Sequence, residues 1–343
     1  MTQTNLSPAP PLLSFAIPTY NRAKYLDQLL GVLLHQAHGE SRVELIVSDN
    51  ASTDNTQEVI EAYRQRGLDM RYLRNEANRG PDFNILQCYE QAIGKYVWVF
   101  GDDDLLLDGA IPYILTLLAR ENPDFVFLAP SIFHESTDEI KTTNRIVPTQ
   151  VIDDLFLMVS LVNLHADPIF ISAAITNKER VSSLGHPPFT SLLGTNLVNL
   201  GWVLTNLCHF RRGVFVQLGT LAARVGNSSG GYLAAEVFGR NYSRMLSDCL
   251  SQNPKLVSKL LQDHLRIWFP RNWLHFRSNG ENGGGTYDVL KKAFRQLPSF
   301  WFCACPLICA PWNLARVWAR LLRIPSDFKL RRLSVSARNA LVH

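Results

Sequence analysis

Three consecutive aspartates, Asp102, Asp103 and Asp104, follow the apolar run 95–100. Like charges at the end of an apolar strand repel one another and lose solvation, so a nearby cation is expected. In an extended segment alternate side chains point the same way, and Asp102 and Asp104 could then share one cation while Asp103 faces elsewhere. Hard oxygen ligands suit Mg²⁺ or Mn²⁺ and leave positions for substrate phosphates. The alternative is a solvated loop whose carboxylates cap the helix expected from Ala110.

Two further polar segments follow apolar runs. Asp49 closes the run 43–47 and could accept hydrogen bonds from a nucleobase or ribose, with an Asx-type turn or a helix cap as the alternative. Arg79 and Gly80 precede an expected helix and could bring a cation and a close backbone approach to phosphates, with a plain turn as the alternative.

The elements that must position these residues alternate two hydrophobic periods. Strands are predicted at 12–17 (ended by Pro18), 43–47, 70–73 and 95–100, and helices at 25–35, around 59–63 and at 81–93. This order predicts an α/β fold with a mostly parallel sheet flanked by helices. Ligands bind beyond the carboxyl ends of such strands, where strand order reverses. The segments at the ends of the first, second and fourth strands should therefore meet in one crevice; they are Thr19-Tyr20-Asn21-Arg22, Asp49-Asn50 and Gly101-Asp102-Asp103-Asp104. The chain has no GxGxxG after the first strand and no GxxxxGK[ST], which argues against dinucleotide oxidoreductases and P-loop enzymes.

Three segments carry a resemblance to a known family: SFAIPTYNRAKYLDQLL, VELIVSDNASTDNT and NRGPDFNILQCYEQAIGKYVWVFGDDDLLLDGAI. In this order and spacing they resemble the nucleotide-sugar-binding half of family 2 glycosyltransferases with the GT-A fold. Within that family they look most similar to the abequosyltransferase-like group, which builds bacterial surface polysaccharides. The resemblance implies an inverting transfer of a hexosyl or deoxyhexosyl group that depends on a divalent metal, Mn²⁺ or Mg²⁺. The donor would be a nucleotide-diphosphate sugar, and the acceptor a saccharide or lipid-linked saccharide.

The resemblance also implies roles for individual residues. Those implied to bind the donor nucleotide are Pro18, Thr19, Tyr20, Arg22, Asp49, Asn78, Arg79, Gly80, Asp102 and Asp103. Asp49 matches the acidic residue that contacts the base or ribose, and Asp102 with Asp104 matches the metal-binding DxD motif.

The residue that takes the proton from the acceptor hydroxyl is less apparent. Family members commonly use a carboxylate in the second half, often in a Glu-Asp pair at the start of a helix. This chain has no such pair between Val151 and Tyr232. Asp167 is the candidate base, with His165 and His186 behind it, because an Asp or a His can take the proton where position and pKa suit. A turn role for Asp167 and packing or capping for His165 are the alternatives.

Two other functions remain open on the sequence. A nucleotidyltransferase would also use acidic metal ligands, but it would usually need a Gly-, Arg- or Lys-rich loop after the first strand, and IPTYNRAKYL lacks one. A catalytically inert nucleotide-sugar-binding protein is the second alternative, because of the missing Glu-Asp pair.

Composition sets the organisation of the chain. With 343 residues, 46% apolar and 19% charged, the chain is neither a small disulfide module nor disordered. The predicted parts are a flexible N-terminus at 1–11 and a GT-A domain at 12–240, with a nucleotide-sugar half at 12–130 and an acceptor half at 131–240. A helical segment and Gly-rich linker follow at 241–285, and a basic amphipathic region at 286–343.

Charge is concentrated in that last region. It holds ten Lys or Arg against two Asp, within a formal charge of +4 for the whole chain. A basic end on a mildly acidic body argues against a nucleic-acid partner and fits an anionic membrane surface. Arg316, Arg320 and Arg323 share a helical stripe beside Trp and Leu residues, as in an interfacial helix; a helix packed on the catalytic domain is the alternative. Without an apparent secretory signal or spanning run, we expect a cytoplasmic protein, peripheral at the inner face of the cytoplasmic membrane.

Overall fold

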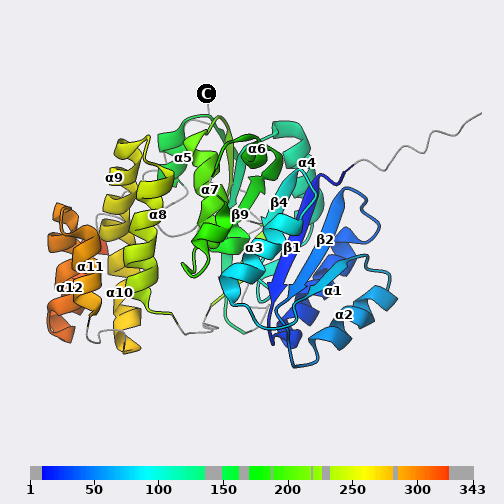
Figure 1. The fold of residues 1–343 in the computed structure, drawn as a ribbon, viewed down its shortest axis with the longest axis horizontal. Coiled ribbons are helices and arrows are strands. Elements are labelled where there is room, and N and C mark those ends of the chain that lie inside the picture. Colours follow the sequence, from blue (N-terminus) through cyan, green and yellow to red (C-terminus); the bar gives the residue numbers. More distant parts are fainter. Residues whose placement is uncertain are drawn as a thin grey trace, which may run out of the picture. The chain divides into compact units, whose positions relative to one another are not determined.

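The computed structural model describes residues 10–135, 149–161, 170–186, 188–217, 219–225, 232–280 and 285–323. The chain divides into two compact units. The first comprises residues 1–158, 168–194 and 198–229, and the second comprises 159–167, 195–197 and 230–343. Figure 1 shows a sheet with helices in the first unit and a group of helices in the second. Every described residue for which the sequence predicts a donor contact lies in the first unit.

The first hundred residues follow the predicted order of strands and helices. The elements are β1 (Leu13–Thr19), α1 (Ala23–Ala37), β2 (Val43–Asp49), α2 (Thr56–Gln65), β3 (Arg71–Arg74), α3 (Pro81–Gln91) and β4 (Tyr96–Val99). The helical spacing has its expected effect in α1, where Leu26, Leu29, Leu30 and Leu33 are all fully buried.

The first strand is longer than predicted, because Pro18 does not end it. β1 continues to Thr19, and Pro18 pairs with Ser48 in the parallel register with β2. The carbonyl of Ala16 accepts from Phe100 N, so the backbone groups of every second residue face β4. Pro18 therefore faces β4 as well, but the pairing with β4 stops at Ala16. The missing N–H of Pro18 costs no sheet hydrogen bond.

The main sheet confirms the predicted, mostly parallel arrangement. Among the described residues it has eight strands in the order β3-β2-β1-β4-β9-β6-β10-β8. Only β9 (Ala174–Asn177) and β8 (Gln150–Ile152) run against the direction of the other strands. Its remaining strands are β6 (Phe125–Leu128) and β10 (Gly213–Val216). The order reverses between β1 and β4, which is where ligands bind in open sheets of this kind.

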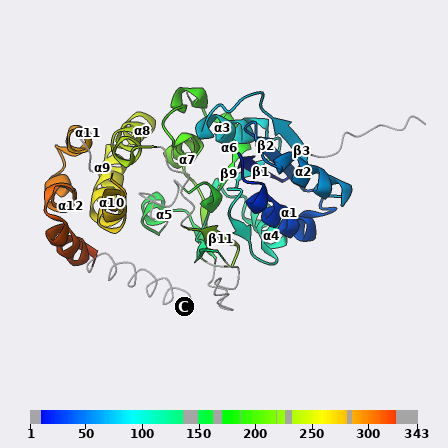
Figure 2. The ribbon, with the colours of Figure 1, turned by 90° about the horizontal axis from the view of Figure 1, so that it is seen from below.

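Helices cover both faces of this sheet, as Figure 2 shows. The helices α1 and α4 (Ala110–Glu121) lie on one face, and α3, α6 (Lys178–Ser183) and α7 (Val198–Cys208) lie on the other. A three-stranded sheet in the order β5-β11-β7 adjoins the first unit's core through Leu106 and Leu221. Its strands are β5 (Leu105–Leu106), β7 (Ser131–Phe133) and β11 (Leu221–Arg224). Short elements complete the set: α5 (Leu155–Leu161) and the 3-10 helices η3 (Ile171–Ala173) and η4 (Phe189–Leu192).

The second unit is built from helices, three of which have π-helical turns. These are η5 (Ala235–Asn241), η6 (His264–Trp268) and η7 (Phe300–Ala304). The α-helices are α8 (Tyr242–Cys249), α9 (Pro254–Asp263), α10 (Phe269–Ser278), α11 (Thr286–Phe294) and α12 (Cys305–Cys309), followed by a helix at 312–323. The buried His264 ring bonds the Phe238 carbonyl at 2.8 Å and so links η6 to η5. Within the described ranges, no helix combines the length and apolar composition needed to span a membrane.

Lys178 holds the C-terminal end of α3 in place. Its Nζ donates to the carbonyls of Tyr89, Glu90 and Ala92 at 2.7, 2.9 and 2.6 Å. We expect Lys178→Met to lower the free energy of unfolding by about 2 kcal/mol, because carbonyls at the helix end lose a charged donor. Urea unfolding measures this, with the exposed Lys24→Met as the control. Equal stability of the two variants would contradict the capping role.

Candidate active site

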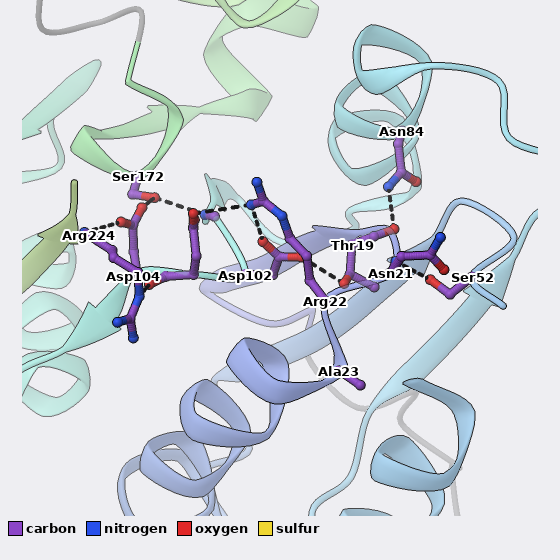
Figure 3. Close-up of polar contacts among 12 residues, drawn as sticks. Thr19, Asn21, Arg22, Ala23, Ser52, Asn84, Asp102, Asp104, Ser172 and Arg224 are labelled. Carbon is purple, nitrogen blue, oxygen red and sulfur yellow. Dashed lines mark hydrogen bonds and ion pairs between the residues drawn. The ribbon is translucent and has the colours of Figure 1, made fainter. Parts of the chain in front are cut away.

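The three aspartates lie in a turn, so the expectation of an extended segment was wrong. Asp104 N donates to the carbonyl of Gly101 at 3.2 Å, which closes the turn directly after β4. Arg22 is a cation that contacts this turn in the structure, and it pairs with Asp102 and Asp103. Arg22 Nη1 contacts Asp102 Oδ1 at 3.0 Å and Asp103 Oδ2 at 3.1 Å. Figure 3 shows the guanidinium beside the turn, with Asp104 turned the other way.

Asp102 joins the ends of β1 and β4. Its Oδ2 accepts a hydrogen bond from Thr19 Oγ1 at 2.7 Å, and its side chain is buried. Thr19 is the last residue of β1, and Arg22 immediately precedes α1. The polar segments after the first and fourth strands therefore meet at the point where strand order reverses, as their positions predict.

Asp104 is held by residues from distant parts of the chain. Its Oδ2 accepts from Ser172 Oγ at 2.6 Å, and its Oδ1 accepts from the backbone N–H of Arg224 at 3.0 Å. Ser172 Oγ also accepts from Gly101 N at 2.8 Å, so one hydroxyl fixes both ends of the turn. Sequence reasoning missed Ser172, because a lone serine in an apolar segment carries no local signal.

Arg224 supports the turn from the opposite side to Arg22. Its Nε donates to the Asp103 carbonyl at 3.1 Å. The guanidinium lies over the rings of Tyr25 and Phe133, 4.8 and 4.4 Å from their centroids. Cation–π contacts of this kind fix an arginine in one orientation. A Gly- and Ser-rich segment begins at Arg224, and its residues 226–231 are outside the described ranges.

The carboxylates of this turn ionise less readily than ordinary aspartates. Burial raises the pKa of Asp102 to about 6, although the Arg22 guanidinium opposes the shift. Burial, reinforced by the Asp103 charge, raises the pKa of Asp104 to about 8. Within the described residues no group of three or more His, Cys, Asp or Glu side chains is arranged to hold a metal ion. The turn nevertheless gathers hard oxygen donors whose ionised forms an added cation would stabilise.

Asp49 lies at the same edge of the sheet but is engaged within the protein. Its side chain is 1% exposed. Oδ1 accepts from Ser52 N at 2.8 Å, and Oδ2 accepts from the Tyr72 hydroxyl at 2.7 Å, with Arg74 Nε at 3.5 Å. These contacts match the turn-forming alternative, because the carboxylate shapes the loop after β2. A contact between Asp49 and a base or ribose stays a prediction.

Asn50, the residue after Asp49, ties the predicted donor-side loop to β2. Its Nδ2 donates to Asn78 Oδ1 at 2.7 Å, and its Oδ1 accepts from Arg79 N at 3.0 Å. Gly80 then adopts a φ of +84°, a conformation that glycine reaches without strain, and α3 begins at the next residue. The Arg79 guanidinium lies 3.3 Å from the centroid of the Phe83 ring. The loop 78–80 is thereby placed beside the end of β2.

Asn84 and Asn21 fix the loops after β1 and β2 through hydrogen bonds. Asn84 Nδ2 donates to the carbonyls of Thr19 and Ser48 at 3.2 and 2.9 Å. Asn21 has a φ of +53° and accepts from Thr53 N at 2.7 Å. Tyr20 lies between these anchored positions with 41% of its surface exposed, so its ring is free to meet a ligand.

The three candidate bases differ in where they lie. Asp167 and His165 lie outside the described residues. His186 stacks on Phe189 with ring centroids 4.3 Å apart, which favours a packing role. The helix α7 has no acidic residue in its first turn. The N–H of Val198, at the start of this helix, donates to Asp82 Oδ1 at 3.3 Å. The start of α7 is therefore capped by Asp82 of α3, and the first turn of α7 supplies no carboxylate.

Folding without a bound cation should become less favourable as the pH rises from about 4 to about 8. The pKa of Asp104 is about 8 in the folded chain against a reference value of 3.8, so the folded state keeps a proton that the unfolded state releases. This contribution is fully present at low pH and is lost across that window. Asp104→Asn stays neutral, so its free energy of unfolding should fall less steeply with pH than that of the wild type.

Urea unfolding at a series of pH values tests this. Subtracting the free energy of unfolding of the variant from that of the wild type removes the contribution of the histidines, which both proteins share. Asp108→Asn, at an exposed position four residues along, is the control and should follow the wild type. Parallel pH profiles for Asp104→Asn and wild type would contradict the assignment.

Comparison with known proteins supports the first unit's identity. Residues 14–176 match the family model of glycosyl transferase family 2. Abequosyltransferase RfbV of Salmonella typhimurium is 43% identical over 31% of this chain and 32% of its own length. A Campylobacter jejuni GalNAc(5)-diNAcBac-PP-undecaprenol beta-1,3-glucosyltransferase is 32% identical over 34% of this chain and 36% of its own length. The chain spans about a third of the length of these curated relatives.

A solved structure supports the fold. The crystal structure of residues 1–349 of S. aureus TarS in complex with UDP-GlcNAc has a TM-score of 0.60 to this chain at 17% sequence identity, covering 96% of this chain and 92% of that one. The shared architecture confirms the predicted α/β fold of the GT-A type. Together with the match of residues 14–176 to the family model, it shows that this part of the chain is similar to family 2 glycosyltransferases.

Proposed function

We propose that the chain transfers a sugar, with inversion, from a nucleotide-diphosphate sugar to a saccharide or lipid-linked saccharide during synthesis of a bacterial surface polysaccharide. The observation that carries the proposal is the meeting of Thr19, Arg22 and Asp102 at the reversal point of a family 2 domain. The relatives support a transfer of this kind, because one is an abequosyltransferase and another transfers glucose to an undecaprenol-linked saccharide.

The donor would bind across the ends of β1, β2 and β4. TarS was crystallised with a nucleotide sugar, and a donor of this class presents a ring, a ribose and two phosphates to a protein. The exposed Tyr20 offers a ring face to the nucleoside. Arg22 offers a guanidinium to the diphosphate, since arginine pairs well with phosphate oxygens. The loop 78–80 is held by Asn50 beside the end of β2, where Arg79 would bring a second cation to the phosphates.

The aspartate turn has the chemistry of a divalent-cation site. Its carboxylates supply hard oxygen donors, and burial already raises the pKa of Asp102 and of Asp104, so a cation would relieve the cost of their ionisation. We propose that Asp102 and Asp104, with Asp103 beside them, hold Mn²⁺ or Mg²⁺. When bound, such an ion would stabilise negative charge on the departing diphosphate. Ser172 and Arg224 keep the turn in shape for that role.

The acceptor hydroxyl needs a base on the opposite side of the sugar from the leaving group. We propose Asp167 for that role, because a carboxylate can take the proton as the hydroxyl attacks the anomeric carbon. The bond to the diphosphate breaks as the new glycosidic bond forms, which inverts the configuration. A lipid-linked acceptor would place the enzyme at the inner face of the cytoplasmic membrane, and this peripheral location is part of the proposal.

Nucleotide binding gives the first test of this function. We expect one of UDP, CDP, GDP and dTDP to raise the thermal stability of the purified chain when Mn²⁺ is present. A ligand at about a hundred times its Kd stabilises the native state by about 2.7 kcal/mol. The effect should be lost in Asp102→Asn/Asp104→Asn and kept in the exposed control Asp108→Asn. Folded protein that responds to no nucleotide would refute the donor site, and pyrophosphate release from a nucleoside triphosphate would indicate a nucleotidyltransferase.

Catalysis by Asp167 requires a separate test. Asp167→Asn should lower kcat by about 10² to 10⁴-fold, the usual contribution of a general base, while nucleotide-dependent stabilisation stays intact. Donor turnover with a saccharide acceptor is the measurement, and Asp153→Asn is a control in the same half of the chain. Unchanged kcat in Asp167→Asn would show that another group takes the proton. Stabilisation without turnover in the wild type, across candidate acceptors, would favour an inert binding protein.

A further inference from the structure

The last described helix, at 312–323 in the second unit, packs inward through small side chains. Ala315 and Ala319 are buried, and positions four apart share one side of a helix. Arg323 is also turned inward, donating to the carbonyls of Pro270 and Arg271 at 2.8 and 3.1 Å. The stripe of three arginines expected from the sequence is therefore divided, because Arg323 caps neighbouring backbone instead of facing outward.

The large apolar side chains of this helix face outward. Leu314 is 61% exposed, Val317 53%, Trp318 37% and Leu321 52%, and the helical repeat places them on one continuous side. Phe302 of η7, 69% exposed, lies next to them because Trp318 Nε1 donates to its carbonyl at 2.8 Å. We call these five residues the apolar strip. An amphipathic helix of a globular protein normally buries such a side, so its exposure indicates a binding surface.

Positive charge borders the apolar strip. Arg316 and Arg320 are exposed one turn apart, on the side of the helix next to Val317. Within the described ranges neither arginine has an ion-pair or hydrogen-bond partner. Residues 285–323 contain six Lys or Arg and a single acidic residue, Asp288. The strip and its border therefore require a partner that is apolar in one part and anionic in the adjoining part.

We propose that the apolar strip docks on an anionic lipid bilayer, with the helix lying along the surface. This deepens the proposed function, from which it takes only the lipid-linked acceptor. An anionic bilayer supplies acyl chains for the strip and lipid phosphates for Arg316 and Arg320, and Trp is favoured at that boundary. Because the side of the helix with Ala315 and Ala319 packs against the protein, only the side with the apolar strip contacts the lipid.

A second copy of the chain fits the surface less well. In a twofold contact through the same strip, each copy would bring Arg316 and Arg320 toward the same residues of the other. The like charges would then be desolvated together without an anionic partner, which costs free energy. The charge pattern therefore favours lipid.

Vesicle flotation of the full chain tests the proposal. We expect binding to phosphatidylcholine vesicles with about 30 mol% phosphatidylglycerol, and much weaker binding to phosphatidylcholine alone. Leu314→Ser/Leu321→Ser should lower the partition coefficient by about tenfold or more, because both side chains are exposed in solution and would be buried in lipid. Arg316→Gln/Arg320→Gln should weaken binding to the anionic vesicles and reduce its salt dependence. Ile93→Ser, at a position 63% exposed in the first unit, is the matched control and should bind as the wild type does.

Three results would overturn the proposal. The first is failure of the wild-type protein to float with anionic vesicles, and the second is equal flotation of Leu314→Ser/Leu321→Ser. The third is a wild-type dimer in sedimentation velocity that the same double substitution dissociates, which would assign the strip to a second copy. Nucleotide-dependent stabilisation is measured on the same variants without lipid. This measurement tests the proposed sugar transfer independently of lipid docking. Vesicle binding without any nucleotide response would leave the docking surface in place and remove the proposed function.

Discussion

The buried charge at the end of β4 is the constraint on which the site depends. Asp102 is removed from water, and its neighbours Asp103 and Asp104 add repulsion, so the turn is stable only where donors surround it. Thr19 and Arg22 supply donors from the end of β1, across 83 and 80 residues of sequence. The same contacts that offset this charge hold the ends of the two central strands together. The stability of the turn and the geometry of the proposed donor site therefore rest on one set of hydrogen bonds.

Side-chain amides extend this arrangement to the neighbouring loops. Asn50 holds the loop 78–80, and Asn84 bonds the carbonyls of Thr19 and Ser48. An amide both donates and accepts, so one buried asparagine can satisfy backbone groups from two loops at once. These residues leave Tyr20 exposed while fixing the backbone on either side of it. Such a support allows exposed groups to meet a ligand with little reorganisation.

The second unit shows the opposite use of polar and apolar groups. Its helix at 312–323 buries alanines and exposes Leu314, Val317, Trp318 and Leu321. The site in the first unit turns charge inward and satisfies it, whereas this surface turns apolar groups outward without covering them in the described residues. Hydrophobic periodicity alone cannot distinguish the two outcomes. It indicates that a helix has an apolar side, but it does not indicate whether the rest of the protein packs against that side.

The sequence by itself determined the α/β order, the mostly parallel sheet and the convergence of the polar segments that follow β1 and β4, because strand and helix periods are local and the carboxyl ends of parallel strands share one edge. Only the tertiary structure decided that Gly101–Asp104 forms a turn, that Asp49 is engaged internally, and that Ser172 and Arg224 hold Asp104. The last contacts join residues 68 and 120 positions apart. Partners at such separations leave no mark on local residue patterns, since packing of the whole unit brings them together.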